Sequence, residues 1–249
     1  MNLTNTKRKY FISDFHFGIP DYESSMLREK KAVEWLEAIK NDADEIYILG
    51  DVFDFWFEYK KVIPKGYTRF LGKLAELSDS GIIIHYFTGN HDMWVFDYFE
   101  KELNFKMYRE PITCTFNNKK FFIGHGDGLG PKDYGYKFIK IIFANPICQF
   151  LFSWIHPDIS IPIANFWSKR SRIANNDEIF ESEEKERLLS FAKSILKKEE
   201  YNYFIFGHRH LPLDIKINEK SRYINTGDWF NNFSYAYFDG NEVYLTTYK

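Results

Sequence analysis

The segment Ile46–Asp54 reads IYILGDVFD, in which four apolar residues are followed at once by Gly50 and Asp51. An apolar run this short, with turn residues directly after it, predicts a buried strand that ends in a polar loop. Because α/β sheets present their binding residues at the carboxyl ends of the strands, Asp51 is a candidate ligand at a sheet edge. The segment therefore predicts an α/β fold with a functional site at that edge.

The same pattern occurs four more times along the chain. Short apolar runs end at positions 12, 87, 123 and 206, and polar residues follow each run. Together with Asp51, the candidate ligands are Asp14, His16, Asn90, His125, His208 and His210. Asp14 and His16 lie two positions apart, as do His208 and His210, and residues at this spacing point the same way in an extended chain. A lone histidine is usually a hydrogen-bonded core residue, but five clusters after five strands indicate one shared site.

The chemistry of these side chains indicates a metal centre. The set contains imidazoles, carboxylates and one amide but no thiolate, which favours catalytic Mn, Fe or Zn over a structural zinc site. The cysteines, Cys114 and Cys148, form no C-x-x-C pair. With one bridging carboxylate, seven residues serve two metals, and two ions ~3.5–4 Å apart clamp a phosphoryl group during hydrolysis. We therefore predict a phosphoesterase with two divalent metal ions, with Mn²⁺ as the first candidate.

Bulk composition limits the class of protein. The chain has 249 residues, 45% of them hydrophobic and 20% aromatic, and a formal net charge of -2. Nothing in this balance indicates nucleic-acid binding, and no obligate protein partner is evident. Two cysteines, no signal-peptide pattern and no run of ~18 apolar residues predict a cytoplasmic protein. Any contact with a membrane is expected to be peripheral, on the cytoplasmic face of the inner membrane.

Hydrophobic periodicity predicts alternating strands and helices, which indicates layered sheets in an α/β domain. Helices are expected over 25–40, 70–77 and 183–198, the first with Leu27 on its buried side. Strands are expected over 10–13, 46–49, 82–87, 120–123, 203–206, 223–225, 235–239 and 243–247.

Residues 132–172 interrupt this alternation. The segment is rich in aromatic and aliphatic residues, is broken by three prolines, and is edged by Lys and Arg. It predicts an inserted apolar and basic helical cap, which leaves 1–131 and 173–249 as the core domain. Its apolar residues form either additional core or an acyl-binding and membrane-docking face, since apolar surface edged with basic charge suits anionic lipid.

Five motifs, D-x-H, G-D-x-x-D, G-N-H-D, G-H and G-H-x-H, occur in order over residues 14–210. In this they resemble the calcineurin-like metallophosphoesterases. The resemblance implies a four-layer αββα sandwich and places His91 beside the metals, where it contacts the phosphoryl or leaving group, with Asp92 orienting it. It implies one metal site made of Asp14, His16, Asp51 and His210, and a second made of Asp51, Asn90, His125 and His208.

Within that family the chain is most similar to the Bacteroidetes-type enzymes that cleave UDP-2,3-diacylglucosamine into UMP and 2,3-diacylglucosamine 1-phosphate in lipid A synthesis. The similarity lies in GDVFDFW at 50–56, HGDG at 125–128 and SKRSR at 168–172. The best-known members carry arginine where this chain has His91. Candidate substrate contacts are Asn90, His91, Asp133, Tyr136, Asn165 and Arg170. Two alternatives are another phosphoesterase, acting on phosphodiesters, nucleotides or phosphoproteins, and a non-catalytic scaffold of the same fold.

Overall fold

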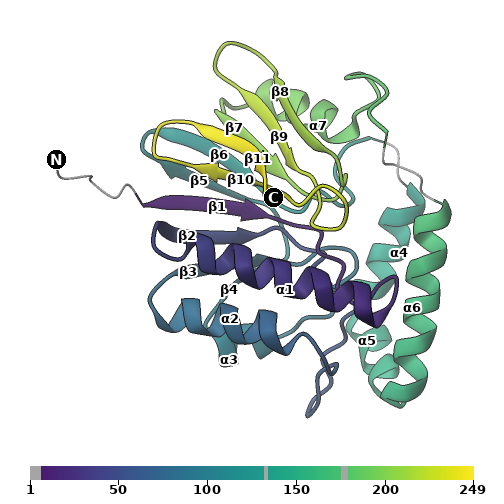
Figure 1. The fold of residues 1–249 in the computed structure, drawn as a ribbon. Coiled ribbons are helices and arrows are strands. Elements are labelled where there is room, and N and C mark those ends of the chain that lie inside the picture. The colour runs from purple at the N-terminus through teal and green to yellow at the C-terminus, as the bar shows by residue number, and fades with distance from the viewer. Residues whose placement is uncertain (1–6, 132–133, 175–178) are drawn as a thin grey trace.

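The computed structural model describes residues 7–131, 134–174 and 179–249, with side chains for all of these except 169–174. Two stacked sheets form its centre (Figure 1). The first sheet runs in the order β11-β10-β1-β2-β3-β4, with β1 to β4 parallel to one another. Its strands are β1 (Arg8–Ile12), β2 (Ala43–Ile48), β3 (Ile83–Phe87), β4 (Lys106–Tyr108), β10 (Ser234–Phe238) and β11 (Val243–Thr247).

The second sheet runs in the order β5-β6-β7-β9-β8, with β6, β7 and β9 parallel. Its strands are β5 (Ile112–Phe116), β6 (Lys119–Ile123), β7 (Tyr203–Phe206), β8 (Pro212–Lys216) and β9 (Arg222–Thr226). Helices α1 (Tyr22–Ile39), α2 (Thr68–Asp79) and α3 (Tyr98–Leu103) cover the first sheet, and α7 (Arg187–Leu196) covers the second (Figure 1). The predicted αββα sandwich is confirmed.

All the predicted strands are present, although the last three divide between the two sheets. Strands β4, β5 and β8 and helix α3 were not predicted. These elements have three to six residues, and β5 and β8 have half-exposed faces in place of a continuous apolar run. Their signal in the sequence is weak because a short strand near the edge of a sheet buries few side chains.

Alternation along the central strands builds three apolar layers. In β1, Ile12 packs toward the helices whereas Phe11 lies between the two sheets. In β7, Ile205 lies between the sheets and Phe204 packs under α7. Both faces of each central strand are therefore buried, which is why these strands read as continuous apolar runs.

Helix α1 turns charged residues inward, contrary to expectation. Leu27, predicted on the buried side, is 67% exposed, whereas Arg28 and Glu29 are buried. The Arg28 guanidinium donates to the carbonyl of His16 at 2.8 Å, and the Glu29 carboxylate accepts from the backbone N–H of Arg69 at 2.8 Å, at the start of α2. These backbone groups need partners, so they fix which face of the helix is inside.

Helices α4 (Tyr134–Ala144), α5 (Pro146–Ser153) and α6 (Pro157–Ala174) stand beside one edge of the sandwich (Figure 1). No residue of α4 or α5 is buried. Bulky apolar side chains 39–79% exposed cover these helices: Tyr134, Phe138, Ile139, Ile141, Ile142, Ile147, Phe150, Leu151, Ile159, Ile163, Phe166 and Trp167. The alternative that this segment adds to the core is therefore wrong.

A small aromatic contact joins these helices to the sandwich. Phe152 of α5 lies with its ring centroid 4.8 Å from that of Phe57 and 4.6 Å from that of Trp94. The indole N–H of Trp94 also donates to the carbonyl of Phe143 at 2.8 Å. None of the helices in the described part of the chain is long and apolar enough to cross a membrane.

Candidate metal centre

The five strand-end clusters meet at one edge of the sandwich, between the two sheets. Three groups of side chains have ligand atoms within 4.8 Å of one another: Asp14, His16 and His210; His16, Asp51 and His91; and Asp51, His125 and His208. Asn90 joins the third group, with its Oδ1 3.2 Å from His125 Nε2. The parallel strands β1, β2 and β3 of one sheet and β6 and β7 of the other deliver these residues, as their sequence positions predict.

The backbone reaches this geometry in a way that the spacing did not predict. The pairs were expected to converge because their chain is extended, but Asp14 and His16 have φ of 55° and 45°, and His208 and His210 have φ of 70° and 52°. Asp51 is also left-handed, at 52°. Such conformations are costly for residues with a Cβ and persist only where the surroundings fix them. The strain is concentrated at the ligand cluster.

Hydrogen bonds hold these strained turns. The Asp14 carboxylate accepts from the backbone N–H of His208 at 2.9 Å and from the hydroxyl of Ser13. The loop after β3 packs directly against the Asp51 carboxylate. A Cβ at position 89 would collide with that carboxylate, so only glycine fits there. The Asp51 carboxylate in turn accepts from the backbone N–H of His91 at 2.8 Å. The clusters therefore lock one another in place.

The donor set fits cations. His125 Nδ1 donates to the carbonyl of Leu49 at 2.6 Å, so Nε2 of the neutral ring presents a lone pair to the site. That atom faces two oxygens, Asn90 Oδ1 at 3.2 Å and Asp51 Oδ2 at 3.3 Å. Asp14 Oδ1 is buried without a hydrogen-bond partner among the described residues. Acceptors that face acceptors repel unless a cation lies between them, so these residues fit a metal pair.

The raised pKa values of two histidines also indicate a site for positive charge. Burial disfavours a proton on His16, but the carboxylates of Asp14 and Asp54 outweigh it and raise its pKa to about 10. Burial likewise opposes a proton on His125, and Asp51 raises its pKa to about 10. The carboxylates thus attract positive charge to the centre, which protons supply when no metal is bound.

Within the described part of the chain, the Asp92 carboxylate has hydrogen-bond partners other than the His91 ring that it was expected to orient. Its carboxylate accepts from the Tyr86 hydroxyl at 2.6 Å and from the backbone N–H groups of Gly89 at 2.7 Å and Val52 at 2.9 Å. Burial and the charge of Asp51 raise the pKa of Asp92 to about 6. Asp92 therefore joins the loop after β2 to the loop after β3, because its carboxylate accepts from a backbone N–H of each.

His91 is oriented by other groups. Its Nδ1 lies 3.0 Å from the carbonyl oxygen of Asp54 and 3.0 Å from Oγ of Ser168 on α6. Burial lowers the pKa of His91. Its ring stands edge-on to His16, with centroids 4.8 Å apart. Ser168 was not predicted as a contact, because no pattern along the chain links the cap to the third motif.

A family model for calcineurin-like phosphoesterases matches residues 7–212. The chain belongs to the calcineurin-like phosphoesterase family. UDP-2,3-diacylglucosamine hydrolase of Porphyromonas gingivalis is 38% identical to it over 254 residues, covering 95% of each chain. The Haemophilus influenzae protein of the same name is 27% identical over 234 residues, covering 92% of this chain and 93% of that one. Among solved structures, Yfce, a phosphoesterase from E. coli, has a TM-score of 0.47 and 15% identity, covering 96% and 92%.

Membership of the calcineurin-like phosphoesterases makes the chain a metal-dependent phosphoester hydrolase with a two-metal site. The predicted substrate contacts outside the cluster have different positions. Tyr136 donates its hydroxyl to Asp127 at 2.6 Å, and its ring centroid lies 6.5 Å from that of His208. Asn165 is exposed on α6. Asp133 and the side chain of Arg170 lie outside the described residues.

One buried ion pair at the phosphoesterase centre was missed in the sequence. Arg209, between the candidate ligands His208 and His210, donates from Nε to both carboxylate oxygens of Glu186, at 3.2 and 3.0 Å. The side chain of Glu186 is 1% exposed, and that of Arg209 is 12% exposed. Glu186 directly precedes α7. The pair joins the last ligand loop to the segment that returns from the cap, a link that spacing does not reveal.

Proposed function

We propose that this phosphoesterase hydrolyses the pyrophosphate of UDP-2,3-diacylglucosamine to UMP and 2,3-diacylglucosamine 1-phosphate, a step of lipid A biosynthesis. The observation that carries the proposal is the combination of a two-metal cluster with three cap helices whose bulky apolar side chains are exposed beside it. Full-length similarity to UDP-2,3-diacylglucosamine hydrolases supports it. Exposed apolar surface of this extent marks an interaction site, and two acyl chains match its chemistry.

We assign the ligands as the motifs suggest. One metal is held by Asp14, His16, Asp51 and His210, and the other by Asp51, Asn90, His125 and His208. The distances of 3.2 Å from Asp14 Oδ1 to His210 Nε2 and 3.3 Å from Asp51 Oδ2 to His125 Nε2 support this division. Imidazole and oxygen ligands without thiolate favour Mn²⁺, with Fe and Zn as alternatives.

The chain's own residues bind and orient the pyrophosphate. When bound, two divalent ions supply Lewis-acid activation of the phosphoryl group and of the attacking water. His91 lies beside the cluster with its Nδ1 held by Asp54, so its Nε2 edge is presented to a phosphoryl oxygen. Asn90, His91 and Tyr136 are the substrate contacts in this proposal, and the hydroxyl of Tyr136 donates to Asp127 at 2.6 Å. Asp133, Asn165 and Arg170 remain candidate contacts.

The cap, residues 132–172, is proposed as the acyl-binding unit and as the surface that docks peripherally on the cytoplasmic face of the inner membrane. Basic residues flank its apolar stretch in the sequence, among them Lys169 and Arg170. Apolar surface with nearby cations binds an anionic interface. Flotation with density-matched anionic and neutral vesicles tests the docking directly. Binding to the neutral vesicles should be weaker, because the basic residues gain no attraction there.

The decisive experiment measures UMP release from UDP-2,3-diacylglucosamine by Mn²⁺-loaded protein. We expect turnover that a chelator abolishes. The double variant Ile163→Ser/Trp167→Ser removes two exposed apolar side chains, 52% and 63% exposed, from one face of α6. It should lose lipid turnover but keep hydrolysis of a small diester, whereas Tyr244→Ser, outside the cap and 45% exposed, should leave both unchanged. Protein that hydrolyses the small diester but not UDP-2,3-diacylglucosamine contradicts the assignment.

A further inference from the structure

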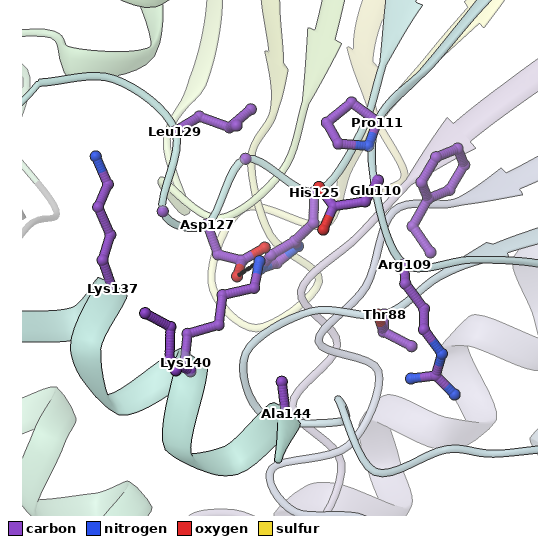
Figure 2. A pocket seen from close by; sticks show the side chains of 14 residues that line it. Thr88, Arg109, Glu110, Pro111, His125, Asp127, Leu129, Lys137, Lys140 and Ala144 are labelled. Atoms are coloured by element: carbon purple, nitrogen blue, oxygen red, sulfur yellow. Dashed lines mark ion pairs between the residues drawn. The ribbon is translucent and has the colours of Figure 1, made fainter. Parts of the chain in front are cut away.

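A cavity of about 390 Å³ opens beside the metal cluster, on the flank formed by His125 and the following loop (Figure 2). It lies between that loop, the β4–β5 connection at Arg109–Pro111 and helix α4. Its volume falls within the ~300–1,000 Å³ typical of small-molecule sites. The cluster residue His91 does not line it, and its ring contacts Ser168 of α6 instead. The cavity therefore borders a different flank of the centre from the one that α6 covers.

The two halves of a bound pyrophosphate substrate lie on either side of the bond that is cut, so they extend from the metals in two directions. The acylated half is matched by the exposed apolar side chains of the cap. The cavity does not suit acyl chains, since the exposed carboxylate of Glu110 lines it and would lose water without gaining a partner. The water-soluble half of the substrate is left for this space.

The lining chemistry matches a nucleoside. Pro111 and Leu129 supply apolar surface for a flat base (Figure 2). Glu110 is exposed, and its carboxylate has no hydrogen bond or ion pair among the residues that the structure describes. A carboxylate in such a position accepts hydrogen bonds from ribose hydroxyls, as acidic residues do in dinucleotide sites. Thr88 adds a small hydroxyl at the cavity wall.

Charge at the inner end of the cavity is arranged to admit an anion. Asp127 is 8% exposed and would repel a phosphate. Lys140 of α4 pairs with it at 2.7 Å (Figure 2). The hydroxyl of Tyr136 donates to the same carboxylate oxygen at 2.6 Å. The carboxylate is thereby neutralised, and Lys140 brings a positive charge next to the metal ligand His125.

We propose that this cavity binds the nucleoside monophosphate half of the substrate, with Glu110 accepting from the ribose diol and the base packed against Pro111 and Leu129. The inference rests on the proposed function and adds to it the subsite that releases UMP. It also explains why α4 is anchored to the core at Asp127, because the anchor forms one wall of the nucleotide site.

Product inhibition tests the subsite. The reporter reaction is hydrolysis of methyl p-nitrophenyl phosphate, which carries no nucleoside, with UMP and 2′,3′-dideoxy-UMP as inhibitors. Glu110→Gln should raise the inhibition constant of UMP about tenfold, the size expected for a hydrogen bond to a charged group, and leave that of the dideoxy compound unchanged. Glu102→Gln, an exposed glutamate on α3, is the matched control and should change neither constant.

A second variant fills the cavity. Ala144 is exposed at the end of α4 and lines the cavity. Ala144→Leu should therefore weaken inhibition by both nucleotides, while the kcat of the reporter reaction stays unchanged. If UDP-2,3-diacylglucosamine is cleaved normally but neither variant alters inhibition by UMP, the subsite is wrong and the proposed function stands. If both variants weaken inhibition by UMP but UDP-2,3-diacylglucosamine is never cleaved, the nucleotide site stands and the proposed lipid substrate is wrong.

Discussion

The Glu186–Arg209 pair offers a quantitative test of how the ligand loop is held. Glu186→Ala leaves the guanidinium of Arg209, only 12% exposed, without this carboxylate. Removing one partner of a buried charged pair costs ~3–5 kcal/mol, and the residual exposure of Arg209 places the expected loss near the lower limit, about 3 kcal/mol. In a domain of this size that corresponds to a fall in Tm of roughly 6–12 °C.

Metal affinity should fall as well, because Arg209 lies between the ligands His208 and His210. Loss of groups that orient metal ligands typically costs ~10–100-fold in affinity. Urea unfolding of the metal-free protein and Mn²⁺ titration by calorimetry measure the two effects separately. The variants Glu186→Gln, Arg209→Met and their combination form a double-mutant cycle, in which we expect a coupling of ~1–3 kcal/mol.

The matched control is the exposed pair Glu183–Lys193, with side chains 53% and 43% exposed and 3.0 Å between the charged atoms. Glu183→Ala should change stability by less than ~1 kcal/mol, as surface ion pairs do. A coupling between Glu186 and Arg209 no larger than that of this pair, together with unchanged Mn²⁺ affinity, would refute the positioning role.

Three further predictions concern the cluster and the cap. Asp51→Ala should abolish binding of the second metal and reduce turnover below detection, measured by metal analysis and UMP release; retention of two metals per chain contradicts the bridge. The pKa of His16 and His125 is raised to about 10, so each stabilises the metal-free fold below pH ~6.5 and loses that contribution as pH rises through about 10. Because a metal must displace these protons, its affinity should increase with pH over 7–9 and binding should release protons, which calorimetry in buffers of different ionisation enthalpy detects. Phe152→Ala should loosen the cap at its contact with Phe57 and Trp94, costing ~1–3 kcal/mol and accelerating proteolysis within α4–α6, whereas cleavage at the rate of the unaltered protein would place the anchor elsewhere.

The sandwich was predictable because its central strands are buried on both faces. Ile46–Leu49 and Tyr203–Phe206 read as continuous apolar runs, which few other structures produce. The edge strands β5 and β8 bury only part of one face, so their composition did not distinguish them from loops. The inward turn of Arg28 and Glu29 was not predicted for a different reason: their partners are backbone groups of other segments, the loop after β1 and the start of α2.

The sequence by itself determined the candidate ligands and their order, because each of them follows a strand closely and so needs only the local chain to reach the sheet edge. Tertiary structure decided what surrounds them. The left-handed backbone at Asp14 and His16 persists only through contacts made across the fold, and so do the link from Ser168 to His91 and the Glu186–Arg209 pair. It also decided that the cap presents its apolar side chains outward, since an apolar run has the same composition whether it faces a core or a ligand.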